Sequence, residues 1–460
     1  MSQPPEWQPP EPGYQPQWSP PPGAQWPAPL PPPAAPPGPQ WDYLGGSPTG
    51  EPPPPKKSGR GRLIASLVAV SALVAGGVAT YVAVSDSSTD RGAGSPEAAI
   101  RTIVGDINKS DLIGVLNDLV PGERTAIAAP FTDLVNQLKR TKVLQPGAAP
   151  ATITGLQVQL KQLTFSGTTI PLNDHVQVLE LTGGTIDLSA DLERVPLTAE
   201  FLKAIFPRGI PQSTSGTQHV DIAQQGAPLR IATQKVGSSW YPSLFYTVAY
   251  QAAGERAPAA GDAVPARGAA SAEDAVKQLI DALLAGSVDR AIALVSPDEL
   301  PALHDYGKKV LAAVGSYQPA PVHLEDLTFT TADIAGGKRV TLSSITLTNQ
   351  DGSKTSVKVD AGCFSISYDG QTKRQCPADL IDTATQSFGF PTKVTAAQRQ
   401  AITDLIAGLG KVGVDTSQTG GQWFVAPVRT YFDLENEILS QLKGNDVIEL
   451  VDLITSFVGN

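Results

Sequence analysis

Two stretches of the chain share one pattern of apolar and polar positions. Residues 95–123 (SPEAAIRTIVGDINKSDLIGVLNDLVPGE) align without a gap on residues 271–299 (SAEDAVKQLIDALLAGSVDRAIALVSPDE). In both stretches apolar residues recur at the i, i+3, i+4 and i+7 spacing that lines one face of a helix. Each stretch therefore predicts two helices, and Ser95 and Ser271 are the predicted N-caps of the first helix in each.

Alternating polar and apolar positions follow in both parts of the chain. The matched blocks are VQLKQLTFS from Val158 with VHLEDLTFT from Val322, HVQVLELT from His175 with RVTLSSIT from Arg339, and GSSWYP from Gly237 with GGQWFV from Gly420. Alternation with a period of two predicts strands with one buried face. Because these blocks come in one order in both parts, we predict an internal repeat.

Helices grouped before strands indicate an α+β fold. We predict two similar domains, each of helices packed on a curved antiparallel sheet, with further helical segments inserted before the closing strand. The predicted boundaries are a first domain at 95–253, a linker at 254–270, a second domain at 271–432 and a C-terminal helix at 433–460, with the helical insertions at 197–206, 378–388 and 395–410.

These two units resemble cystatin-like, nuclear-transport-factor-2-like domains. The resemblance rests on the helical opening of residues 271–299 and on the closing Gly-x-x-Trp-aromatic strand, and it covers about 95–250 and 271–432. It implies that a helical lead packs into a curved sheet to form a cone. That family includes both enzymes and plain binding modules, so the resemblance leaves the function open.

A stretch of 22 uncharged residues, 63–84, is long enough to cross a bilayer as a helix of roughly 33 Å. Four cations precede it within residues 56–62, and Asp86 and Asp90 follow it. By the positive-inside rule, the N-terminus is cytoplasmic and the C-terminal domains are extracytoplasmic. A cleaved signal peptide is the alternative, but a leader of 62 residues favours an uncleaved, single-pass anchor.

The segment before this anchor, residues 1–62, is rich in proline. Residues 1–55 hold 22 of the 42 prolines and almost no Val, Ile or Leu, a composition typical of a disordered cytoplasmic tail. Such a tail either docks onto protein partners or serves as a solvated spacer. The whole layout of Pro-rich tail, one anchor and exported domains is similar to conserved envelope membrane proteins of actinobacteria.

The net charge of −10 falls on the part beyond residue 84, because the four acidic and four basic side chains of residues 1–62 cancel. An acidic globular part disfavours nucleic acid as a partner. Cys363 and Cys376 are the two cysteines of the chain and lie on the predicted exported side, so we predict that they form a disulfide. The four histidines are scattered, and no metal site or cofactor is predicted.

Two tryptophans occupy matching places before the end of each unit, Trp240 and Trp423. Each either closes the core over its sheet or stacks on a ligand in a pocket. No nucleophile elbow, P-loop or zinc-protease motif occurs in the sequence. We therefore predict a non-enzymatic envelope scaffold whose paired domains bind a protein or a lipid-like ligand. The alternative is a cone-pocket isomerase or dehydratase with Asp360 as base and Tyr368 as proton donor.

Overall fold

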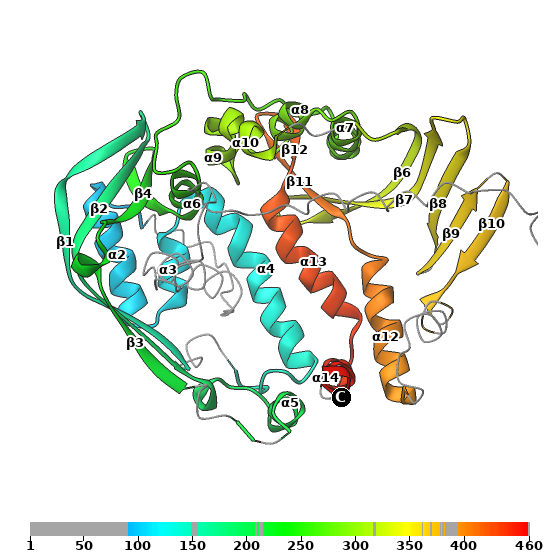
Figure 1. Cartoon of the computed structure of the whole chain (residues 1–460), viewed down its shortest axis with the longest axis horizontal. Coiled ribbons are helices and arrows are strands. Elements are labelled where there is room, and N and C mark those ends of the chain that lie inside the picture. The colour runs from blue at the N-terminus through cyan, green and yellow to red at the C-terminus, as the bar shows by residue number, and fades with distance from the viewer. Residues whose placement is uncertain are drawn as a thin grey trace, which may run out of the picture. The chain divides into compact units, whose positions relative to one another are not determined.

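The computed structural model describes residues 91–458 except 149–154, 208, 211–214, 316–318, 361, 369, 378, 380 and 382–393. The predicted tail (1–62) and membrane helix (63–84) lie outside the described residues. The chain divides into Met1–Lys57 and Ser58–Asn460, and all described residues belong to the second of these units. This unit has an α+β fold with two antiparallel sheets, as predicted (Figure 1).

The first half of this unit places three helices before its sheet and one helix after it. Its helices are α2 (Pro96–Asn108), α3 (Leu112–Asp118), α4 (Pro121–Arg140), α5 (Ala199–Ile205) and α6 (Leu244–Ala252). Its strands are β1 (Leu156–Asn173), β2 (Val176–Asp191), β3 (Ser215–Asp221), β4 (Leu229–Val236) and β5 (Ser239–Ser243).

The second half also places helices before its sheet and has more elements than the first half. Its described helices are α7 (Ala272–Leu284), α8 (Val288–Ala293), α9 (Pro301–Asp305), α10 (Gly307–Val314), α12 (Ala396–Leu409), α13 (Pro427–Gln441) and α14 (Asp446–Val458). Its strands are β6 (Val322–Ile334), β7 (Gly337–Asn349), β8 (Lys354–Asp360), β9 (Cys363–Tyr368), β10 (Gln371–Gln375), β11 (Val414–Thr419) and β12 (Gln422–Val425).

One long strand organises each sheet. On one side, β2 pairs with β1, and on the other side its first part pairs with β4 and its second part with β3. In the second sheet β7 pairs with β6 on one side, and with β11 and then β8 on the other. The strands β5 and β12 complete these sheets next to β4 and β11. Among the described strands, the β9–β10 hairpin has no counterpart in the first half.

The opening helix of each half packs on one face of its sheet. Ser95 and Ser271 cap α2 and α7 through their side chains, which confirms both predicted N-caps. Ile100 of α2 and Val276 of α7 are buried, as the apolar spacing predicted. The residues before each helix form isolated bridges to the tryptophan strand, Ala93 to Trp240 and Ala269 to Trp423.

A buried glutamate supports the helix on the opposite face of each sheet. Glu123 accepts hydrogen bonds from the Ser243 hydroxyl (2.5 Å) and from the backbone N–H groups of Leu244 (2.8 Å) and Phe245 (3.2 Å), at the start of α6. In the second half Glu299 accepts from the N–H of Val428 (3.1 Å), at the start of α13. These carboxylates satisfy helix N–H groups that lack intrahelical partners.

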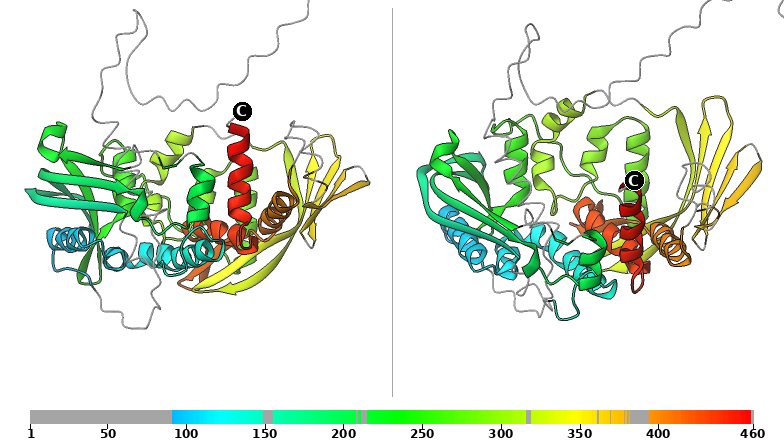
Figure 2. Two further views of the ribbon diagram at one scale, coloured as in Figure 1. Left: turned by 90° about the horizontal axis from the view of Figure 1, so that it is seen from below. Right: turned by 60° about the horizontal axis from the view of Figure 1, so that its bottom comes forward.

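Helices of the two halves pack against each other within this unit. The helix α4 lies along α13 (Figures 1 and 2). Phe432 of α13 joins an apolar cluster with Leu116 and Ile127 of the first half. A second shared cluster joins Tyr246 of α6 to Tyr306, which lies between α9 and α10. The two halves therefore share parts of their apolar cores.

Polar contacts add to this interface. Asp305 of α9 accepts hydrogen bonds from the Asn173 amide and the Tyr246 hydroxyl, both at 2.7 Å. The hydroxyl of Tyr306 donates to the carbonyl of Arg256 (3.2 Å). These side chains hold the end of the first half and the start of the segment that follows it against α9.

The segment 254–270 is not the flexible linker that its composition suggested. Its backbone binds the second half, through the N–H of Val264 to the carbonyl of His304 (2.9 Å) and the N–H of Arg267 to the carbonyl of Ala293 (2.7 Å). Val264 is also buried. These contacts come from residues that are distant in the sequence, so the Ala/Pro/Gly composition gave no sign of them.

The C-terminal helix also differs from the prediction. The chain forms α13 and α14, which are separated by residues 442–445, where the sequence pattern suggested one helix from residue 433 onward. Leu442 takes an extended conformation and Gly444 has a φ of 47°, a combination that ends one helix before the next begins. The helix α13 starts at Pro427, directly after β12, just as α6 directly follows β5.

The disulfide and two predicted helical insertions are confirmed. The sulfur atoms of Cys363 and Cys376 lie 2.10 Å apart and join the start of β9 to the residue after β10. The insertions at 197–206 and 395–410 form α5 and α12. Most of the segment 378–388 lies outside the described residues.

The buried Glu123 predicts how stability changes with pH. Burial raises its pKa from an ordinary value of 4.5 to about 7. Between these values the folded chain holds a proton that the unfolded chain has lost, so the free energy of unfolding falls as pH rises from about 4.5 to 7. We expect Glu123→Gln to reduce this slope by about 1.4 kcal/mol per pH unit, the contribution of one proton.

Urea unfolding of the full chain at several pH values between 5 and 7.5 measures this slope. Glu200→Gln is the control, because Glu200 is an exposed residue in the first turn of α5. An unchanged slope in Glu123→Gln would show that this carboxylate does not keep its proton in the folded chain.

Candidate functional site

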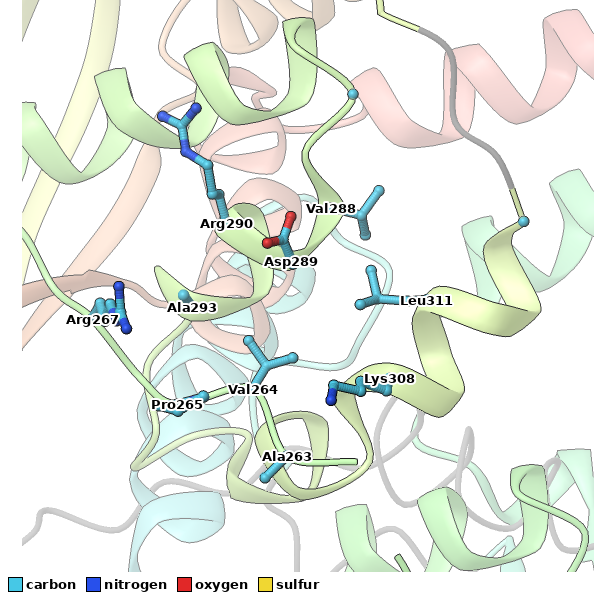
Figure 3. A pocket seen from close by; sticks show the side chains of 12 residues that line it. Ala263, Val264, Pro265, Arg267, Val288, Asp289, Arg290, Ala293, Lys308 and Leu311 are labelled. Atoms are coloured by element: carbon cyan, nitrogen blue, oxygen red, sulfur yellow. The ribbon is translucent and has the colours of Figure 1, made fainter. Parts of the chain in front are cut away.

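An open pocket of about 640 Å³ lies where residues 263–267 cross the helices α8 and α10. Its wall comes from separate segments of the second half, Ala263 to Arg267, Gly286 to Ala293, and Lys308 to Gly315. In Figure 3 the side chains of Val264, Val288 and Leu311 face one another across its middle, and Lys308 and Arg267 lie on opposite sides of Val264. The pocket therefore has an apolar middle with charged side chains around it.

Local structure holds these segments in place. Gly286 has a φ of 70°, which lets the chain turn sharply from α7 into α8. The ring nitrogens of the buried His304 lie within hydrogen-bond distance of two carbonyl oxygens, Nδ1 at 2.9 Å from that of Val264 and Nε2 at 3.0 Å from that of Val295. His304 thus ties the segment before α7 to the segment after α8, and this keeps the pocket wall together.

The charged residues of the pocket are exposed and unpaired. Arg267, Arg290, Lys308 and Asp289 are all exposed to solvent. None of these four side chains makes a hydrogen bond or an ion pair with any part of the chain that the structure describes. Three cations against one carboxylate give the pocket a net positive lining in a chain whose net charge is −10. This lining suits an anionic group.

A buried ion cluster lies elsewhere in the second half. The guanidinium of Arg339 binds Asp415 (2.8 Å), Asp433 (2.5 Å) and Glu437, between β7, β11 and α13. Burial, followed by the neighbouring Asp415 carboxylate, raises the pKa of Asp433 to about 7. The guanidinium offsets part of the charge of these carboxylates, and the cluster joins α13 to the sheet, so we interpret it as structural.

The structure places the two tryptophans at the edge of each sheet, partly buried. Trp423 packs on the apolar cluster under α7, which includes Val276 and Val340. The Lys235 amine lies over the ring of Trp240, 5.9 Å from its centre. Neither tryptophan lines the pocket described above.

The residues of the enzymatic alternative are not brought together. Asp360 is paired with Cys363 at one end of the β8–β9 ladder, whereas Tyr368 is paired with Thr355 at the other end. Both side chains are exposed. Within the described ranges, no group of three or more His, Cys, Asp or Glu side chains is arranged to hold a metal ion.

The sequence interpretation missed the pocket residues and the two buried glutamates. One signal was present: directly before the aligned stretches, Arg91-Gly92-Ala93 matches Arg267-Gly268-Ala269. A Cβ atom on either glycine would overlap the tryptophan strand, at Ser239 for Gly92 and at Gln422 for Gly268. Extending the alignment by these residues would have identified 267–270 as part of the second unit.

No family model, curated protein or solved structure matches the chain. The resemblance to cystatin-like and nuclear-transport-factor-2-like domains therefore stays a prediction. The helices of the described residues include none with the length and apolar character needed to span a membrane. The predicted anchor at 63–84 is not among those residues.

The packing of Trp423 predicts the effect of truncating it. Because Trp423 is partly buried against the α7 cluster, we expect Trp423→Ala to lower the free energy of unfolding by about 2–3 kcal/mol. Urea unfolding followed by circular dichroism measures this change, and Trp423→Phe should lose clearly less. A variant with unchanged stability would instead favour a role for this tryptophan in ligand binding.

Proposed function

We propose that the chain is a single-pass envelope protein whose tandem exported domains bind a ligand or partner and do not catalyse a reaction. In this proposal residues 63–84 anchor it, the Pro-rich tail faces the cytoplasm and recruits protein partners, and the α+β halves lie outside the membrane. The observation that carries the binding role is the pocket of the second half, with its apolar middle and three unpaired cations.

We also propose that the two halves are copies of one domain. Support comes from the matched pairing of β2 and β7, from the helices α2 and α7, which start and end at aligned residues, and from the buried glutamates. Side-chain bonds match as well. Thr233 donates to the carbonyl of Gln177 (3.1 Å), and the aligned Thr416 donates to that of Lys338 (2.9 Å).

A binding role fits these features better than the cone-pocket enzyme. The pocket is built by the segment before α7 together with α8 and α10, not by the sheet strands on which Asp360 and Tyr368 lie. Its charged side chains are exposed, whereas catalytic acids and bases work in water-excluded surroundings that shift their pKa values.

Photo-crosslinking in cells that produce the chain tests this role. We expect a photoreactive phenylalanine analogue in place of Asp289 to form an adduct with a bound molecule, since Asp289 lines the pocket. The matched control places the analogue at Ile113, the residue of the first half that aligns with Asp289. No adduct at position 289, or the same adduct at both positions, would contradict the pocket as the binding site.

A further inference from the structure

The first half contains an arginine, Arg91, that can be compared with Arg267 of the pocket. This arginine aligns with Arg267, and each precedes a glycine and then an alanine that forms a bridge to the tryptophan strand. Arg91, however, forms an ion pair with Asp106 of α2, at 3.3 Å. Asp106 also binds the amine of Lys109 at 3.1 Å. The first half therefore supplies its own anion for these cations.

The second half lacks that anion. Ala282 stands where α2 has Asp106, and Leu294 stands where the first half has the buried Asp118. Arg267 is consequently left without a carboxylate partner among the described residues, and Lys308 and Arg290 add two further unpaired cations on the same pocket. An anion from outside the chain would give Arg267 the partner that Arg91 has in Asp106.

The apolar middle of the pocket restricts which anions fit. Val264, Val288 and Leu311 face one another there, with Lys308 and Arg267 on either side (Figure 3). A free inorganic anion would contact the cations and leave this apolar surface exposed to water. A molecule that carries its anionic group on an apolar stem would cover both parts.

We propose that the pocket of the second half binds an amphiphilic anion, with its phosphate or carboxylate on Arg267 and its apolar stem on Val264, Val288 and Leu311, toward Lys308 on the opposite side. This inference rests on the binding role proposed above and names the class of ligand. Both phospholipid-like and fatty-acid-like molecules have this chemistry.

Titration calorimetry on the full chain in nanodiscs of neutral lipid, with empty nanodiscs as the blank, tests the inference. The probes are hexyl phosphate, hexanoate, inorganic phosphate and 1-hexanol. We expect at least one hexyl anion to bind about tenfold or more tightly than inorganic phosphate or hexanol. Tighter binding of hexyl phosphate would indicate a phosphate-bearing lipid as the ligand, and tighter binding of hexanoate would indicate a fatty acid.

Single variants then assign the site. Arg267→Ala should weaken binding of the hexyl anion by about five- to tenfold, in keeping with the loss of one charge-assisted hydrogen bond, and Lys308→Ala, on the opposite side of the pocket, should weaken it less. Arg91→Ala is the matched control, because it removes the aligned arginine that is already paired with Asp106, and it should bind like the unaltered chain. Thermal unfolding of each variant verifies that the fold is intact.

The inference is overturned if neither hexyl anion binds, if hexanol binds as tightly as they do, or if Arg267→Ala binds like Arg91→Ala. An adduct at position 289 combined with no binding of hexyl anions would leave the binding role standing and reject this ligand class. If the adduct is also absent, the pocket itself is rejected as a site.

Discussion

The constraint on which this fold depends is the buried start of the helix that follows each tryptophan strand. A helix exposes unsatisfied N–H groups at its first turn, and inside a protein these groups have no water to bind. Glu123, in the first turn of α4, and Glu299, just before α9, provide the missing acceptors. Each glutamate thereby ties the helices that precede the sheet of its half to the helix that follows that sheet, α6 or α13.

The details of this contact differ between the halves in a way that follows from single residues. Pro427 has no N–H group, so the bond that Leu244 donates to Glu123 has no counterpart in the second half, whereas Val428 donates to Glu299 as the aligned Phe245 does to Glu123. Ala426 stands where Ser243 offers its hydroxyl to Glu123, and the guanidinium of Arg429 lies 4.0 Å from Glu299 instead. Burial raises the pKa of Glu299 to about 7, as it does for Glu123. The two halves thus surround the buried glutamate at this helix start with different side chains.

The secondary structure was largely predictable, because capping residues, helical spacing and strand alternation are local signals. The register of the strands was not. Thr233 pairs with Gln177 and Thr416 with Lys338, so the aligned blocks that began at His175 and Arg339 were three residues out of register. Both faces of β2 are covered, since Val178 and Leu179 are both buried, and alternation gives no register in such a strand. The pocket escaped prediction for another reason: its residues come from three separate segments and are mostly exposed.

Electrostatics explains why the apolar middle of the pocket matters to the proposed ligand. A chain with a net charge of −10 repels small anions in general, and salt screens the attraction of exposed cations beyond about 8 Å. Arg267 and Lys308 are exposed, so neither cation alone would hold a small anion tightly. An apolar stem adds about 0.8 kcal/mol for each CH₂ group that it buries, and ionic screening does not weaken this term. The cations would then select an anionic ligand over a neutral one, and the surface formed by Val264, Val288 and Leu311 would add affinity that does not depend on charge.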